Sequence, residues 1–272
     1  MPAPDSTEPT LALLADTDLV VLGRMPWSSN ITLLCELWPA GTRPDAGLAR
    51  DDDADGAVVV GPDSDPERAA RAEGHAPLGR AIYKPHRGEQ PLWDFPDGLY
   101  QREVGAFELG RALGWDVVPP TVERDGPFGI GSAQWFVEAD HEEHYFTFLD
   151  EEDLHPQLRR MAAFDLVANS TDRKGGHLLA DPERHLWAID NGLCLHAEFK
   201  LRTVIWDFAG EPVDADLAED LARFLEADLP PYLDDVLDAF EADALRTRTA
   251  ALLAEGRLPS DPAGRRVPWP LV

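Results

Sequence analysis

The sequence changes character near Glu138, and this change limits the fold more than any other feature. Before Glu138, short apolar runs alternate with turn-forming residues, as in strands, and one stretch has helical spacing. After Glu138, apolar residues recur mostly at helical spacing. A strand-rich half followed by a helical half predicts an α+β fold with two lobes. We expect residues 1–138 to form the N-terminal lobe and residues 139–272 the C-terminal lobe.

The N-terminal half contains the predicted strands and one prominent helix. The strands are predicted at Leu19–Arg24, Ile31–Leu37, Gly79–Pro85, Val117–Val122 and Ala133–Val137. The first two are expected to form a hairpin, and the helix covers Tyr100–Leu113, with Gly114 as its stop signal. Residues 40–78 are acidic and rich in proline and glycine, so we expect a mobile insertion there, with one strand at 57–60.

The C-terminal half contains further helices and two short strands. The helices are predicted at Leu158–Val167, Val213–Ala227 and Tyr232–Glu255, and the strands at Leu178–Leu179 and Leu186–Ile189. Stripes of leucine and phenylalanine make the last two helices amphipathic, so each has one face to bury. The proline-rich stretch Leu258–Val272 is expected to run over the surface.

The charge of the chain limits its partners. There are 24 Lys and Arg residues against 51 Asp and Glu residues, a formal net charge of −27. Such a surface repels nucleic acid and anionic lipid headgroups, so we expect neither nucleic-acid binding nor stable membrane association. A nucleotide, which is also an anion, would need a locally positive pocket. The chain has only three lysines, Lys84, Lys174 and Lys200, and each is therefore informative.

Other patterns exclude several protein classes. No run approaches the roughly 18 apolar residues of a membrane span, and acids stand where a signal peptide has basic residues, so we expect a cytoplasmic protein. We also expect a monomer. Cys35 and Cys194 lack metal-ligand spacing and are expected to be buried, reduced thiols. The chain contains no GxSxG, HExxH or P-loop motif, and His141 and His144 are expected in a loop or helix start.

Four chemically suited residues follow one another along the chain. Lys84 closes an apolar strand, and Glu103 lies early on the next predicted helix. Asp172 lies in a loop that contains two glycines and ends at His177, and Asp190 follows an apolar strand. Phosphoryl transfer needs a cation for the phosphates, a carboxylate that holds this cation, an acid at the acceptor and metal ligands. Each residue alone could be an ordinary turn-forming or solvent-exposed residue. Together, and in this order along the chain, the four residues indicate a phosphotransferase.

These residues lie in stretches that resemble the phosphatidylinositol 3-/4-kinase-like superfamily, closest to the type II phosphatidylinositol 4-kinases, in a bacterial branch. The matching stretches are YKP at Tyr83–Pro85, REVGA at Arg102–Ala106, VVPPT at Val117–Thr121, QWFVE at Gln134–Glu138, NSTDR at Asn169–Arg173 and AIDNGL at Ala188–Leu193. The resemblance covers about 175 residues, ending at Leu193. It implies a two-lobed protein-kinase-like fold that binds ATP and Mg²⁺ or Mn²⁺.

The resemblance also implies roles for individual residues. Lys84 would bind the ATP phosphates and pair with Glu103, Asp172 would be the catalytic-loop acid, and Asp190 would bind the metal. The backbone near Phe136, Val137 and Glu138 would meet the adenine, and Ser28, Ser29 and Asn30 would lie in the turn over the phosphates. The segment His196–Asp207 would be the activation segment, which normally determines the acceptor.

Two departures from the family pattern bear on function. His177 stands where such kinases place an asparagine that binds a second metal ion; an imidazole ligand would favour Mn²⁺ or a single metal. The chain also lacks the basic surface and the cysteine-rich segment of the membrane-bound lipid kinases. We therefore expect a protein or a small molecule as acceptor. A nucleotide-binding pseudokinase and an AMP transferase, built from the same parts, remain alternatives.

Overall fold

The computed structural model describes residues 7–25, 30–42 and 76–272. Ser28, Ser29, most of the predicted insertion at 40–78 and the predicted strand at 57–60 lie outside the described residues. The chain divides into two compact units. The first comprises Met1–Gln101 and Pro120–Phe136, and the second comprises Arg102–Pro119 and Val137–Val272. The predicted lobe boundary at residue 138 stays a prediction.

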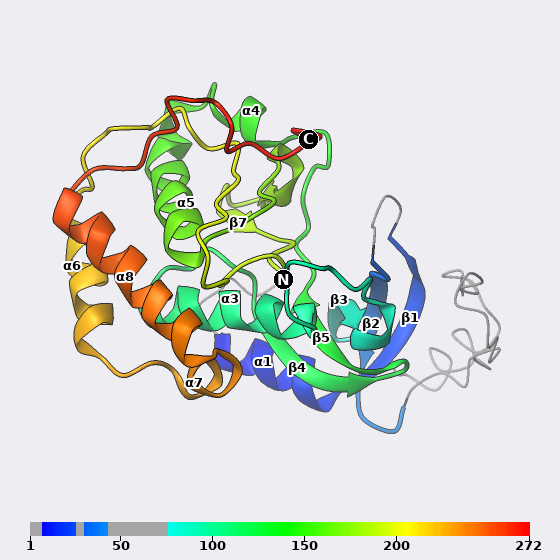
Figure 1. Ribbon diagram of the computed structural model, residues 1–272. Coiled ribbons are helices and arrows are strands. Elements are labelled where there is room, and N and C mark those ends of the chain that lie inside the picture. The colour runs from blue at the N-terminus through cyan, green and yellow to red at the C-terminus, as the bar shows by residue number, and fades with distance from the viewer. Residues whose placement is uncertain (1–6, 26–29, 43–75) are drawn as a thin grey trace. The chain divides into compact units, whose positions relative to one another are not determined.

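The first unit is built on a five-stranded antiparallel sheet with the order β1-β2-β3-β5-β4 (Figure 1). The strands are β1 (Asp18–Arg24), β2 (Leu33–Trp38), β3 (Gly79–Pro85), β4 (Thr121–Gly126) and β5 (Gly129–Trp135). The helix α1 (Thr7–Asp16) packs against β4 and β5. A 3-10 turn, η1 (His86–Gly88), follows β3 directly.

Alternation along β3 determines which of its side chains enter the core of the first unit. Ala81 and Tyr83 are fully buried and pack with Cys35 of β2, whereas Lys84 is only partly buried. Successive side chains of a strand point to opposite faces, so Lys84 faces away from the core that Tyr83 fills. The sheet thus presents the Lys84 side chain on the face opposite its apolar core.

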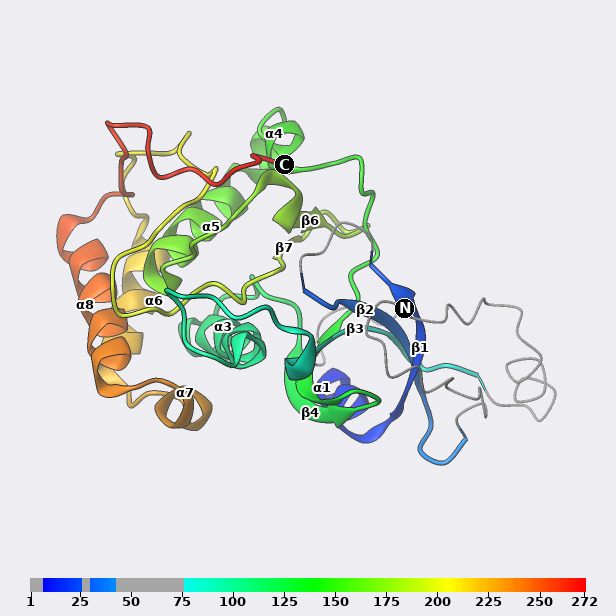
Figure 2. The same ribbon diagram turned by 45° about the vertical axis from the view of Figure 1, so that its right-hand side comes forward.

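The second unit is mainly helical (Figure 2). Its helices are α4 (Tyr145–Phe148), α5 (His155–Ala168), α6 (Ala215–Glu226), α7 (Pro231–Val236) and α8 (Ala239–Glu255), with the 3-10 turns η2 (Glu152–Leu154) and η3 (Gly175–His177). The strands β6 (Leu178–Ala180) and β7 (Leu186–Ala188) form a separate antiparallel pair. The helix α3 (Leu99–Leu113) begins in the first unit and continues in the second.

Within the described residues, the structure contains a strand or helix at each predicted place, corrects some bounds and adds α1 and α4. The strand predicted at Val117–Val122 begins only at Thr121, because Pro119 and Pro120 precede it and have no N–H to donate. The helix predicted at Tyr232–Glu255 is two helices. Asp238 separates them: its carboxylate accepts the N–H groups of Phe240 and Glu241, both at 2.8 Å, and caps α8.

Both cysteines are buried, unpaired thiols, as predicted. Burial raises the pKa of Cys35 and that of Cys194 to about 12. A thiol with such a pKa is protonated at neutral pH, so neither residue supplies a nucleophilic thiolate. Among the helices of residues 7–25, 30–42 and 76–272, none combines the length and the hydropathy that a membrane crossing needs.

Candidate functional site

The loop that carries Asp172 begins at Asn169, where α5 ends. Asn169 adopts a left-handed backbone conformation, with φ of 58°, which terminates the helix. Its buried side-chain amide donates to the carbonyls of His196 and Glu198, and its oxygen accepts the N–H of Lys200 at 2.9 Å. Asn169 therefore fixes the start of the loop and the segment 196–200 to one another.

Arg173, the residue after Asp172, is the centre of a buried hydrogen-bond network. Its Nε donates to Asp165 Oδ1 at 3.0 Å, and both side chains are almost fully buried. Its other nitrogens donate to the carbonyl of Ile189 at 2.7 Å and to Asn191 Oδ1 at 2.6 Å. Ile189 and Asn191 flank Asp190, so one guanidinium binds the backbone on one side of that residue and a side chain on the other, and links both to the loop of Asp172.

Asp172 is partly exposed, and its environment disfavours the ionised carboxylate. Burial is the main cause that raises its pKa, and the negative charge of Asp190 adds to the effect. Lys174, whose Nζ lies 3.1 Å from Asp172 Oδ2, and Arg202 oppose the rise. The charges of Asp172 and Asp190, which come from separate segments of the chain, therefore interact.

Asp190 lies just after β7 with a positive φ of 58°. This conformation is uncommon for residues other than glycine and is a form of backbone strain often found at functional sites. The side chain is 55% exposed, and its Oδ2 lies 3.4 Å from Nε2 of His177. The strained turn therefore presents a carboxylate that solvent can reach.

His177 is oriented by both ring nitrogens. The backbone N–H of Lys174 donates to Nδ1 at 3.4 Å, which makes Nδ1 an acceptor and places the ring proton on Nε2. Nε2 then faces Asp190 as a donor rather than offering a lone pair to a metal ion. In this arrangement the imidazole orients Asp190; the predicted role of His177 as a metal ligand stays a prediction.

Glu103 of α3 is buried, and its Oε2 accepts the backbone N–H of Asn191 at 2.9 Å. The neighbouring Arg102 forms a buried ion pair of 2.7 Å with Glu241. Glu108, in contrast, lies near Arg111 at 3.7 Å on a more exposed part of the helix. Glu103 is therefore the glutamate directed toward the turn that holds Asp190, and its pairing with Lys84 stays a prediction.

The residues predicted to meet the nucleotide are distributed over both units. In the first unit, Asn30 Oδ1 accepts the N–H of Gln90 at 2.9 Å, and the ring of Phe136 lies 4.6 Å below the guanidinium of Arg80. In the second unit, Val137 packs with Leu179 and Trp187, and Glu138 is the next residue. Nothing in these contacts tests the predicted adenine and phosphate roles, which stay predictions.

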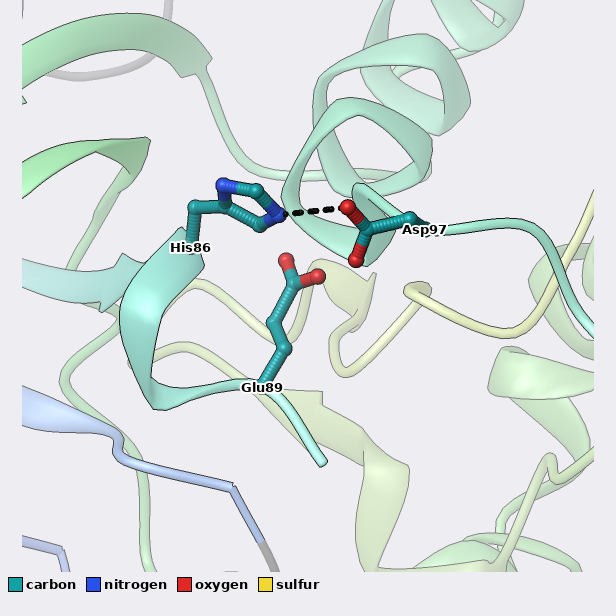
Figure 3. Close-up of side chains that lie close together, drawn as sticks. All are labelled: His86, Glu89 and Asp97. Atoms are coloured by element: carbon teal, nitrogen blue, oxygen red, sulfur yellow. Dashed lines mark hydrogen bonds and ion pairs between the residues drawn. The ribbon is translucent and has the colours of Figure 1, made fainter. Parts of the chain in front are cut away.

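The structure also brings together three side chains that sequence reasoning missed. The ligand atoms of His86, Glu89 and Asp97 all lie within 4.8 Å of one another (Figure 3). Both Glu89 oxygens, however, accept backbone N–H groups at the start of α3, those of Leu99 and Tyr100. His86 Nε2 lies 3.1 Å from Asp97 Oδ2. A helix cap and an exposed ion pair account for the cluster, so we assign it no metal.

Comparison with solved structures defines the class of fold. A five-stranded antiparallel sheet in the N-terminal portion and a mainly helical C-terminal portion make a protein-kinase-like fold, as predicted. The crystal structure of the Golgi casein kinase matches 98% of this chain and 78% of its own, with a TM-score of 0.50 and 12% identity. The Helicobacter pylori proinflammatory kinase CtkA matches 90% of this chain and 94% of its own, with a TM-score of 0.44 and 10% identity.

The sequence comparison then gives the family. No family model matches the chain. Protein Rv2133c of Mycobacterium tuberculosis (strain ATCC 25618 / H37Rv) is 33% identical over 302 aligned positions, which cover 95% of this chain and 94% of the relative. The chain belongs to the same family as Protein Rv2133c.

Proposed function

We propose that this protein is a nucleotide- and divalent-metal-dependent phosphotransferase. One observation supports the proposal above the others: Asp172 and Asp190 come from separate segments, their charges interact, and Arg173, next to Asp172, binds both neighbours of Asp190. In a protein-kinase-like fold, a catalytic-loop acid and a metal-binding acid are the two carboxylates that phosphoryl transfer needs. The proposal assigns these two roles to Asp172 and Asp190.

The residues of the site fit a divalent cation in part. Hard cations such as Mg²⁺ prefer oxygen ligands, and the exposed carboxylate of Asp190, with Asp172 in range of its charge, supplies them. The Asn191 amide oxygen is bound by Arg173, and His177 presents an N–H. When bound, a divalent cation would neutralise the charge that develops on the transferred phosphoryl group.

The proposed roles of the side chains follow from their environments. Asp172 orients the acceptor hydroxyl and accepts its proton, for which a pKa above the usual range of aspartate is favourable. Asp190 is held by the turn and by His177, so it presents its carboxylate in one direction. Lys84, on the face of β3 opposite the core, binds the nucleotide phosphates as a point charge.

A labelling experiment tests the proposal and includes the prediction for Lys84. The protein is incubated with γ-labelled and, separately, α-labelled ATP, with Mg²⁺ or Mn²⁺ and an extract of matched cells. We expect transfer of the γ label only, and the Lys84→Met variant should lose at least about 100-fold of this transfer, because its ammonium is the proposed cation for the phosphates.

The control for Lys84 is Arg87→Met, which removes an exposed cation two residues after β3 and should leave transfer unchanged within about twofold. Transfer of the α label alone would identify an AMP transferase instead. A protein that shows neither transfer nor a thermal shift with ATP would refute the nucleotide-dependent function.

A pseudokinase is the second candidate, and the orientation of His177 favours it. The Nε2 proton of His177 is directed at Asp190. In the sequence, this histidine stands where the kinases that the chain resembles have a metal-binding asparagine. Substitution of His177 by Asn would supply an amide oxygen that hard cations prefer. If the chain is a pseudokinase, His177→Asn should tighten Mn²⁺ binding about tenfold or more, measured by calorimetry in the presence of ATP.

The control for this substitution is His185→Asn, which changes a histidine outside the proposed site. An equal effect of both substitutions on Mn²⁺ binding would contradict a specific role of position 177. If the wild-type chain already transfers phosphate at an ordinary kinase rate, about 1–100 s⁻¹, the pseudokinase function is refuted.

The acceptor is proposed on charge alone. The net charge of −27 opposes approach to anionic lipid surfaces, so we propose a protein or a small molecule as acceptor, and a monomeric cytoplasmic enzyme. A phosphoinositide kinase, the activity that the sequence resemblance suggests, would require binding to anionic vesicles at physiological salt. Cosedimentation with such vesicles distinguishes the two.

A further inference from the structure

The segment Arg266–Val272 runs along the second unit and ends beside the loop that follows Asp172. Figures 1 and 2 both show this segment, in red, reaching α4. The backbone N–H of Gly175 donates to the carbonyl of Leu271 at 2.7 Å. A Cβ atom added at Gly175 would lie 3.3 Å from the side chain of Val272 and 3.2 Å from Phe146, so the segment lies directly on the loop.

The other end of the segment is fixed to the predicted activation segment. The carbonyl of Arg266 accepts the N–H of Thr203 at 3.0 Å and the indole N–H of Trp206 at 3.1 Å. Its guanidinium lies over the ring of Phe199 at 4.5 Å, and its own N–H donates to Asp261 at 2.7 Å. Arg266 thus contacts three residues of the stretch 196–207.

The two contact regions are also joined to one another. Arg173 and Thr203 form a parallel bridge, in which Arg173 donates to the carbonyl of Arg202 at 3.0 Å and accepts from Val204 at 3.1 Å. The segment Arg266–Val272 therefore closes a ring of hydrogen bonds that passes through the Asp172 loop and the predicted activation segment. A ring of this kind restrains both stretches at once.

The loop at Gly175 and Gly176 is flexible without a restraint. The contacts that Arg266–Val272 makes with it are mainly hydrogen bonds rather than buried apolar surface. Gly175 and Gly176 lack side chains and give the loop more backbone freedom than any other residues would. Pro268 is the buried residue of Arg266–Val272, and Trp269 is 87% exposed. Since little apolar area is buried, the segment contributes mainly directed hydrogen bonds rather than hydrophobic stability.

We propose that Arg266–Val272 is a positioning segment of the phosphotransfer site, which fixes the two-glycine loop and thereby the direction of the Asp172 carboxylate. The proposal rests on the proposed function, since it assigns the segment to that reaction. The segment acts through the loop and touches no reacting atom. A misplacement of about 1 Å in such a loop is enough to cost up to about 100-fold in rate.

The test is a chain that ends after Trp269, which lacks the Leu271 carbonyl and the Val272 side chain but keeps the Arg266 contacts. We expect hydrogen exchange of the Gly175 amide to accelerate at least about tenfold, while the Thr203 amide stays protected. We expect kcat for phosphoryl transfer to fall about tenfold or more, with KM for ATP changed less than about twofold. Far-UV circular dichroism and thermal melting verify that the variant is folded.

A matched substitution and an independent readout complete the test. Arg265→Ala changes the exposed residue that precedes the segment and should alter neither exchange nor kcat. Unchanged exchange at Gly175, or faster exchange with unchanged kcat, overturns the proposal. If even the full chain transfers no phosphate, the proposed function fails, and hydrogen exchange of the Gly175 amide in the shortened chain then decides the structural claim on its own.

Discussion

Replacement of Asp190 with asparagine is expected to lower phosphoryl transfer about 10³-fold or more at saturating ATP. The amide keeps the shape of the side chain but removes the negative charge that the proposed function uses to hold the divalent cation. A loss of this size corresponds to about 4 kcal/mol of transition-state stabilisation. The measurement is initial-rate transfer from γ-labelled ATP, with Mg²⁺ and Mn²⁺ each titrated, since weak metal binding would show as a demand for higher concentrations.

The same variant has a second expected result that does not require activity. The charge of Asp190 raises the pKa of Asp172, so Asp190→Asn should lower that pKa, measured by NMR titration of the Asp172 carboxyl group. The control is Asp153→Asn, an exposed acid on η2 in the same unit, which should change neither the rate nor the titration. Transfer by Asp190→Asn within threefold of wild type would contradict the metal-binding role.

Strand β3 and the residues around it show what sequence alone can predict. Its bounds follow from alternation: Ala81 and Tyr83 enter the core, and Lys84 faces the other side. Local rules of this kind also place the end of α3 at Leu113, because Gly114, which has a positive φ, follows it. Where the bounds of a strand or helix depend on residues adjacent in the sequence, they can be predicted from the sequence alone.

The environment of Asp190 shows what sequence could not predict. The bonds from Arg173 to Ile189 and Asn191 join segments that are 16 and 18 residues apart. The hydrogen bond between Gly175 and Leu271 is made by backbone atoms, which every residue carries. The types of the two residues therefore give no sign of it in the sequence. Sequence reasoning identified Asp172 and Asp190 as acids of interest, but not the arginine that fixes their surroundings.

The helix α1 was missed for a related reason. Residues Thr7–Asp16 include Asp16, Glu8 and Pro9, and the helix is only weakly amphipathic, with Leu14 as its buried residue. Its position depends on β4 and β5, which lie more than 100 residues further along the chain. The carbonyl of Leu14 accepts a hydrogen bond from the Arg124 guanidinium, and that of Thr17 does so at 2.9 Å. Tertiary contacts, rather than local pattern, fix this helix.

The buried pair of Arg173 and Asp165 leads to the largest expected effect on stability. Substitution of Arg173 by Met would leave the carboxylate of Asp165 buried, with the Thr203 hydroxyl at 2.8 Å as its remaining side-chain donor. It would also remove the donor to Asn191 and to the carbonyl of Ile189. Breaking a buried pair by removing one partner costs about 3–5 kcal/mol, so the free energy of unfolding, measured with urea, should fall by that amount.

A compensating substitution distinguishes an uncompensated charge from lost packing. In the double variant Arg173→Met with Asp165→Asn, neither residue of this pair leaves a buried charge, and the amide oxygen still accepts from Thr203. We expect the double variant to be more stable than Arg173→Met alone, whereas Arg202→Met, at an exposed neighbour, should change stability by less than about 0.5 kcal/mol. If the double variant is no more stable than the single one, the loss of stability in Arg173→Met comes from lost packing and not from the unpaired charge of Asp165. Phosphoryl transfer should remain low in both, because the backbone around Asp190 has lost its anchor in each.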